Sequence, residues 1–228
     1  MKNEYIVKTA ILVDGGFYRR RAQTVLGEKT AAERAKELND YCRKHLKRDT
    51  YETQQLYKIF YYDCPPTNKK IYHPLLQRDI DLGKTELYTW TKEFFEQLKK
   101  QRKFALRLGK LADEQAHYTL KFPIIKKLCS GKLQFDKLTE QDFTLSIEQK
   151  GVDMKIGIDI ASLAYKHQVD RIILISGDSD FVPAAKLARR EGIDFILDPL
   201  FSPIKPDLFE HIDGLRSCDK KFNPDLRN

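Results

Sequence analysis

The chain has 228 residues and a mass of 26.7 kDa, a length that favours one domain with elaborations over two separate domains. Hydrophobic residues make up 41% of it, which is enough for a folded core and excludes an intrinsically disordered chain. The 41 lysines and arginines exceed the 33 aspartates and glutamates, and the net charge of +8 favours an anionic partner. No apolar run is as long as a membrane span, and the first residues show no signal-peptide pattern. We therefore expect a cytoplasmic protein without a membrane partner.

The predicted elements begin with an apolar run over residues 10–13, which is typical of a strand buried on both faces. A tight Asp-Gly-Gly turn follows, and a helix is expected from near Phe17. Residues 31–48 carry apolar side chains at helical spacing, which predicts an amphipathic helix. Residues 58–62 predict a second strand, which ends at Asp63 because two prolines follow closely. This alternation favours an α/β fold with a mostly parallel sheet.

The pattern changes over residues 67–149, which are more polar. Within them, residues 104–108 alternate like a strand. Between Lys92 and Lys132 there are eleven basic residues and four acidic ones, so this stretch holds nearly all of the excess positive charge. We predict that residues 67–149 form a basic helical and hairpin elaboration of a single domain that spans residues 1–228.

The last part of the chain returns to the first pattern. Residues 154–167 predict a helix that is buried on much of its circumference, with Ile158 and Tyr165 on its second apolar face. Asp153 is expected to cap the start of this helix. The remaining expected elements are a strand of the parallel type, a helix and a last strand, over residues 171–176, 183–191 and 194–197.

Four of the predicted strands are followed closely by an aspartate, and these are Asp14, Asp63, Asp178 and Asp198. The carboxyl ends of parallel strands meet at one edge of a sheet, so several of these side chains are expected to lie close together. Carboxylates in such a cluster repel one another unless a cation lies among them. Oxygen ligands without clustered histidine or cysteine suit Mg²⁺ or Mn²⁺, and the four cysteines are too far apart in sequence to indicate zinc.

Each of these aspartates also has an ordinary interpretation as a turn former or helix cap. We keep that interpretation for Asp63 and Asp198, each of which comes shortly before proline. It is weaker for Asp14, because the glycines after it allow a ligand to approach the backbone. It is weakest for Asp178 and Asp180, which share a glycine-bearing turn after a buried strand.

Asp153 and Asp159 are both candidate metal ligands, but they lie six residues apart in one predicted helix. That spacing corresponds to about 9 Å of rise and about 120° of rotation, so a regular helix does not direct both carboxylates at one ion. Asp153 is the first choice, because a helix N-terminus favours a carboxylate, although an ordinary cap explains it equally well. Asp159 is ranked second.

Three blocks of the sequence together resemble a known family. They are Ile-Leu-Val-Asp-Gly-Gly-Phe, Lys-Gly-Val-Asp and Ile-Ser-Gly-Asp-Ser-Asp-Phe-Val-Pro, over residues 11–17, 150–153 and 175–183. In type and order they resemble the NYN domain of the PIN-like nuclease superfamily, in its LabA-like branch. The resemblance spans about Ala10 to Pro199. One difference is Phe17, where many members of the family carry asparagine.

This resemblance implies a Rossmann-like, PIN-type three-layer fold and a metal-dependent ribonuclease that hydrolyses phosphodiester bonds in RNA with Mg²⁺ or Mn²⁺. It implies metal-binding and catalytic roles for Asp14, Asp153, Asp178 and Asp180, with Asp159 as a further candidate ligand. The residues that we expect to bind the substrate are Lys150, Arg19, Ser176 and Ser179. A solvated charged face is the alternative for at least two of the arginines 19–21. The partner is expected to be RNA or another single-stranded nucleic acid, and a homo-oligomer is left open.

Two other functions remain open. The chain could be an RNA-binding or regulatory module of the same fold with little or no cleavage activity, which the basic elaboration would suit. A metal-dependent phosphatase is third. That chemistry usually needs a second acid two residues after an aspartate nucleophile, and after Asp14 this position is Gly16. Assays of RNA cleavage with Mn²⁺ distinguish the nuclease from the module.

Overall fold

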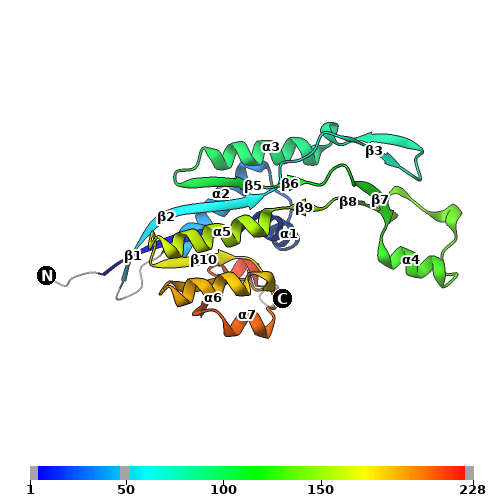
Figure 1. The fold of residues 1–228 in the computed structure, drawn as a ribbon. Helices are drawn as coiled ribbons and strands as arrows, with labels where there is room; N and C mark the ends of the chain where they lie inside the picture. The colour runs from blue at the N-terminus through cyan, green and yellow to red at the C-terminus, as the bar shows by residue number, and fades with distance from the viewer. Residues whose placement is uncertain (1–4, 47–51, 224–228) are drawn as a thin grey trace. The chain divides into compact units, whose positions relative to one another are not determined.

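The computed structural model describes residues 5–46 and 52–223 (Figure 1). Its internal contacts group into two compact units. The first unit contains the residues up to 63, residues 93–109 and the residues from 151 onward, and the second contains residues 64–92 and 110–150. The segment that we predicted as a basic elaboration therefore contributes to both units, because residues 93–109 belong to the first.

The first unit is built on one six-stranded sheet in which every neighbouring pair is parallel, in the order β12-β11-β10-β1-β2-β5. Its strands are β1 (Tyr5–Asp14), β2 (Glu52–Asp63), β5 (Phe104–Leu108), β10 (Arg171–Ile175), β11 (Asp194–Asp198) and β12 (Gly214–Leu215). This sheet confirms the predicted α/β fold. The predicted apolar runs are its centre, since residues 10–13 and 172–175 are completely buried.

Helices cover both faces of this sheet (Figure 1). They are α1 (Gly15–Leu26), α2 (Ala31–Lys44), α5 (Val152–Tyr165), α6 (Val182–Arg190), α7 (Pro206–Glu210) and the part of α3 (Glu86–Lys99) from residue 93 onward. Tyr61 packs against Phe94 and Phe95 of α3, with ring centroids 5.6 and 6.2 Å away. Its neighbour Tyr62 donates a hydrogen bond to a side chain of α5 instead. Since successive residues of a strand point to opposite faces, α3 and α5 lie on opposite sides of β2, as in a three-layer fold.

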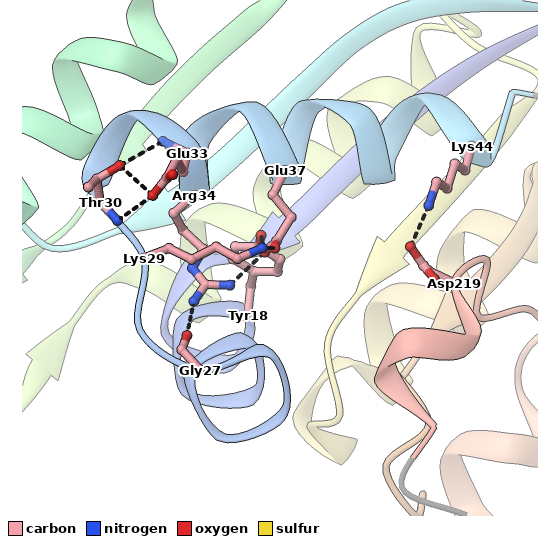
Figure 2. Close-up of polar contacts among 9 residues, drawn as sticks. All are labelled: Tyr18, Gly27, Lys29, Thr30, Glu33, Arg34, Glu37, Lys44 and Asp219. Carbon is pink, nitrogen blue, oxygen red and sulfur yellow. Dashed lines mark hydrogen bonds and ion pairs between the residues drawn. The ribbon is translucent and has the colours of Figure 1, made fainter. Parts of the chain in front are cut away.

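Polar contacts fix α1 against α2 (Figure 2). The Thr30 hydroxyl and the Glu33 carboxylate form a capping box that starts α2. One turn further, Glu37 accepts hydrogen bonds from Tyr18 of α1 at 3.1 Å and from Arg34 at 2.6 Å, and it also pairs with Lys29. The link from Tyr18 to Glu37 holds the helix that follows β1 in place.

The predicted start and burial of α5 need correction. The N-cap is Gly151, which adopts a left-handed conformation with φ of 79°, so Asp153 lies in the first turn and does not cap the helix. The second apolar face is not buried, because Ile158 and Tyr165 are 59% and 57% exposed. The face with Ile156 and Ile160 is the completely buried one, and α5 packs against strands β1, β2 and β5.

A buried polar network lies behind the end of β11. Asp198 is fully buried and accepts hydrogen bonds from the Ser217 hydroxyl at 2.6 Å and the Leu200 amide at 2.8 Å, and from Tyr41. Its Oδ2 also lies 2.8 Å from Nε2 of the buried His45. Asp198 thus makes the local contact expected of a turn residue, through the Leu200 amide, but it is also the central acceptor of a buried cluster that the sequence did not predict.

This network makes stability depend on pH. Burial alone would lower the pKa of His45, but its hydrogen bonds and attraction to Asp198 and Cys218 outweigh burial and raise the pKa to about 9. A histidine whose folded pKa is raised stabilises the fold fully below its unfolded pKa, and this contribution is lost as the pH rises through the folded value. We expect the free energy of unfolding to fall by roughly 3 kcal/mol between pH 6.5 and pH 10 from this group. Urea unfolding should show this loss in the wild type, and an equal loss in His45→Gln would contradict it.

The second unit consists of antiparallel strand pairs and a short helix. Its elements are β3 (Lys70–His73), β4 (Arg78–Asp81), β6 (Lys110–Leu111), β7 (His117–Leu120), α4 (Phe122–Cys129), β8 (Phe143–Ser146) and β9 (Gln149–Lys150), with the first residues of α3. The buried His73 packs against the rings of Tyr118 and Phe143, which joins β3 to the β7–β8 pair. Residues 121–135 contain four lysines and no acidic residue. This unit thus presents a local basic surface around α4.

None of the helices within the described residues combines the length and the apolar composition that crossing a membrane requires.

Candidate active site

The pairing of β1 with β10 brings two distant parts of the chain together. Val13 lies opposite Ile175 in the parallel register, so the residues that follow them emerge at the same edge of the sheet. There the buried Ser176 donates a hydrogen bond from its hydroxyl to Oδ2 of Asp14 at 3.2 Å. The other oxygen of Asp14, Oδ1, accepts from the Phe17 amide at 3.0 Å, so Asp14 is also the N-cap of α1.

Hydrogen bonds continue from Ser176 to the next two acidic residues. The Asp178 amide donates to the Ser176 hydroxyl at 3.3 Å, and the Asp180 amide donates to Oδ1 of Asp178 at 3.0 Å. Asp178 is thereby the N-cap of the short turn η4 (Ser179–Phe181). Both carboxylates are exposed, so they are open to a ligand from solvent. The β10 end of the site is thus a single hydrogen-bonded turn.

Asp153 of α5 interacts electrostatically with the other carboxylates of the site. Burial raises the pKa of Asp153, and the negative charges of Asp178 and Asp180 raise it further. Burial also raises the pKa of Asp14; hydrogen bonds from Phe17 and Ser176 oppose this, and the charge of Asp153 adds to it. Three separate segments of the chain therefore place carboxylates within range of mutual repulsion, which favours a bound cation.

The side chains present fit a hard divalent cation by their donor chemistry, because they offer carboxylate and hydroxyl oxygens without sulfur or imidazole. Within residues 5–46 and 52–223, however, no three histidine, cysteine, aspartate or glutamate side chains are close enough together to coordinate one ion. Both oxygens of Asp14 are engaged in hydrogen bonds. Coordination would thus require the exposed carboxylates of Asp153, Asp178 and Asp180 to turn toward the ion.

Asp159 lies in a different environment. Its Oδ2 accepts a hydrogen bond from the Tyr62 hydroxyl at 2.8 Å and pairs with Nε of Arg107 at 3.0 Å. The Arg107 guanidinium of β5 balances the charge of Asp159, and the Tyr62 hydroxyl of β2 hydrogen-bonds it. Asp159 is therefore already engaged by side chains of β2 and β5.

The three arginines of α1 have three different environments. Arg19 pairs with the fully buried Asp63, with Nε 2.9 Å from Oδ2 and Nη2 3.0 Å from Oδ1. Asp63 is thus a buried ion-pair partner and not an ordinary turn residue. Arg21 donates to the carbonyl oxygens of Leu200, Phe201 and Phe222.

Arg20 is the arginine whose charge acts on Asp14. It is exposed, and its positive charge acts against the effects of burial and of Asp153 on the pKa of Asp14. Sequence reasoning selected Arg19, because three consecutive arginines give no signal that separates a buried partner from a free one. The structure shows that Arg19 is bound to Asp63, which comes from the distant strand β2.

The other expected substrate-binding residues differ in accessibility. Ser176 is buried within the hydrogen-bonded cluster, and the Ser179 hydroxyl accepts from Lys205 at 3.0 Å. Lysine 205 was missed, because it lies outside every motif block. Lys150 is exposed and belongs to the second unit. There its backbone lies opposite Lys110 in the antiparallel pair of β6 and β9.

The glycine of the first motif block serves packing. A Cβ atom at Gly15 would lie 2.5 Å from Cζ of Tyr61 and 2.6 Å from the Tyr62 carbonyl oxygen. The turn after β1 therefore needs glycine because β2 approaches it closely. Phe17 packs in a similar way, since a Cβ at Gly177 would lie 2.9 Å from its ring. The phenylalanine at this position thus covers the turn that precedes Asp178.

The chain matches one family model and is similar to a solved structure. The model of the NYN domain matches residues 88–204, which is just over half of the chain and contains Asp153, Asp178 and Asp180 but not Asp14. A solved structure of a protein of unknown function from Vibrio parahaemolyticus RIMD 2210633 is similar with a TM-score of 0.51 and 15% identity, over 97% of this chain and 99% of that chain. At this identity the likeness shows a shared fold alone. No curated protein matches the chain.

Proposed function

Because the chain belongs to the NYN domain family and has its nuclease-type fold, we propose that it is a ribonuclease that hydrolyses phosphodiester bonds in RNA with Mg²⁺ or Mn²⁺. We also assign it to the LabA-like branch, on the Lys-Gly-Val-Asp and Ser-Gly-Asp-Ser-Asp-Phe blocks. The observation that carries the proposal is the chain of hydrogen bonds that joins Asp14 through Ser176 to Asp178 and Asp180 at one edge of the sheet, near Asp153, whose pKa is raised. Burial and the charges of Asp178 and Asp180 raise it, as expected where carboxylates are gathered for a cation.

In this proposal Asp14, Asp153, Asp178 and Asp180 hold the cation. When bound, a divalent ion lowers the pKa of its water and stabilises negative charge on a phosphate. The chain's own residues prepare the site for it. Ser176 holds Asp14 in one orientation through its hydroxyl and receives the Asp178 amide, so it couples the two strand ends. Ser176 is thus a positioning residue.

Positive charge on the chain would attract the RNA. Arg20 is exposed and close enough to influence Asp14, so it is suited to a phosphate that flanks the scissile bond. In the second unit, the exposed lysines 121, 126, 127 and 132 provide attraction to the backbone that does not depend on sequence. Binding should therefore weaken steeply as salt concentration rises.

Asp178→Asn tests the proposal. We expect wild-type protein to cleave a single-stranded RNA in Mn²⁺ and to lose this activity in EDTA. The variant should cleave about 100-fold more slowly, because a neutral amide is a weaker ligand for a hard cation than a carboxylate. Initial rates of oligonucleotide cleavage measure the effect.

The matched control is Asp40→Asn, which makes the same change at an exposed position of α2 outside the site. It should cleave as the wild type does. Cleavage that survives in Asp178→Asn would refute the assignment of the site. Binding to RNA that is sensitive to salt, without cleavage in any metal, would support the alternative of a binding module.

A further inference from the structure

An open groove of about 450 Å³ lies between the first turns of α5 and α6 in the first unit. The two helices pack against each other, and the groove follows their junction. Much of its lining is apolar and comes from Met154, Pro183, Ala184 and Leu187. Met154 is 71% exposed, so the apolar lining is accessible to a ligand.

A glycine inside α5 keeps this groove open. Gly157 lines the groove, and a Cβ atom built on it would meet no atom of the described residues within 4 Å apart from its chain neighbours and the backbone of its own helix. Glycine within a helix is less stable than alanine, so a helix glycine is expected to have a steric reason. Unlike Gly15, Gly157 has no close neighbour that supplies one. The space is therefore available to a molecule from outside the chain.

Two carboxylates of the proposed active site also line the groove. They are Asp153 and Asp180, whose charges act on each other. A nucleotide whose phosphate is held at these carboxylates through a cation thus has its base within reach of the groove. The apolar side chains suit the faces of a base, and the carboxylate oxygens can accept hydrogen bonds from its edge.

From these contacts we infer that the groove binds one nucleobase of a single-stranded RNA, next to the phosphate at the acidic site. The inference rests on the proposed function and adds a base-binding subsite to it, which a base can enter only when it is unpaired and unstacked. The groove is large enough for this ligand, since binding pockets for small molecules start at about 300 Å³. Pairing with the same groove of a second copy is disfavoured, because it would bring the same carboxylates face to face.

The test uses the 228-residue chain with Gly157→Leu, which fills the groove, and Gly157→Ala, which fills it less and should not impair folding. The matched control is Ala161→Leu, a small residue one turn further along α5 that does not line the groove. Two fluorescent oligonucleotides are compared: a single-stranded RNA, and the same ribose-phosphate backbone without bases. Affinity is measured by anisotropy in Ca²⁺, a divalent cation that also takes oxygen ligands, and cleavage is measured in Mn²⁺.

We expect Gly157→Leu to weaken binding of the intact RNA about tenfold, as loss of one base contact predicts, and to leave binding of the abasic strand unchanged. Gly157→Ala should show a smaller effect in the same direction, and Ala161→Leu none. In Mn²⁺ the loss should appear in KM and not in kcat.

Other outcomes overturn the inference. Equal loss for both oligonucleotides would show that the backbone and not a base is affected, and no loss for either would show that the groove takes no part. A change from dimer to monomer in Gly157→Leu, with unchanged RNA binding, would assign the groove to a protein contact. If no protein cleaves RNA in any metal, the proposed function fails, while the anisotropy comparison still decides whether a base enters the groove.

Discussion

Asp198→Asn is expected to reduce the free energy of unfolding by about 3–5 kcal/mol, the usual effect of removing one partner of a buried ion pair. The carboxylate is completely buried and is surrounded by donors, which include His45, Ser217 and the Leu200 amide. An asparagine turns one acceptor oxygen into an NH₂ group, which then faces these donors. The charge of His45 loses its partner at the same time.

Asp194→Asn is the matched control, because it makes the same change at the opposite end of β11. Asp194 pairs with Arg171 and is 37% exposed, so solvent screens the pair. Its loss should be below about 1 kcal/mol. Urea unfolding of both variants measures the difference, and similar losses at the two ends of the strand would contradict the central role of Asp198.

Gly15→Ala is the second substitution with a large expected effect, a loss of about 3 kcal/mol or more. The added methyl group would lie 2.5 Å from the Tyr61 ring and 2.6 Å from the Tyr62 carbonyl oxygen. Neither can move easily, since Tyr61 is fully buried with its hydroxyl bonded to Asp63, and the carbonyl belongs to the backbone of β2.

The control for this change is Gly157→Ala, the same substitution in a helix where the methyl group meets nothing. It should stabilise the protein by about 1 kcal/mol, since alanine is the better helix former. Thermal unfolding separates the two variants by the sign of their effect. If Gly15→Ala were stabilised, β2 would not lie in close steric contact with this turn.

Much of the first unit could be predicted from sequence. The apolar runs at residues 10–13 and 172–175 identified the two central strands, because strands that are buried on both faces are continuously apolar. The same patterns missed the outer parts of the sheet. β1 begins at Tyr5, ahead of its apolar run, and the short edge strand β12 has no pattern long enough to detect.

Sequence could predict which strand ends lie side by side better than it could predict the contacts of the side chains there. Strand ends indicated which carboxylates share an edge, and the sheet order places β1 beside β10. Sequence patterns could not show that Asp63 is bound to Arg19 or that Asp198 lies in a buried network. In both cases the deciding partner is distant in sequence, and local periodicity carries no information about it.

The neighbouring positions of β1 and β10 also affect how the protein is made. Asp14 leaves the ribosome early in synthesis, whereas Ser176 and Asp178, to which it is linked, emerge more than 160 residues later. Because domains are translated from the N-terminus, a nascent chain carries the first acid long before it can build the site. A truncated translation product that ends before β10 would therefore lack the assembled acidic group.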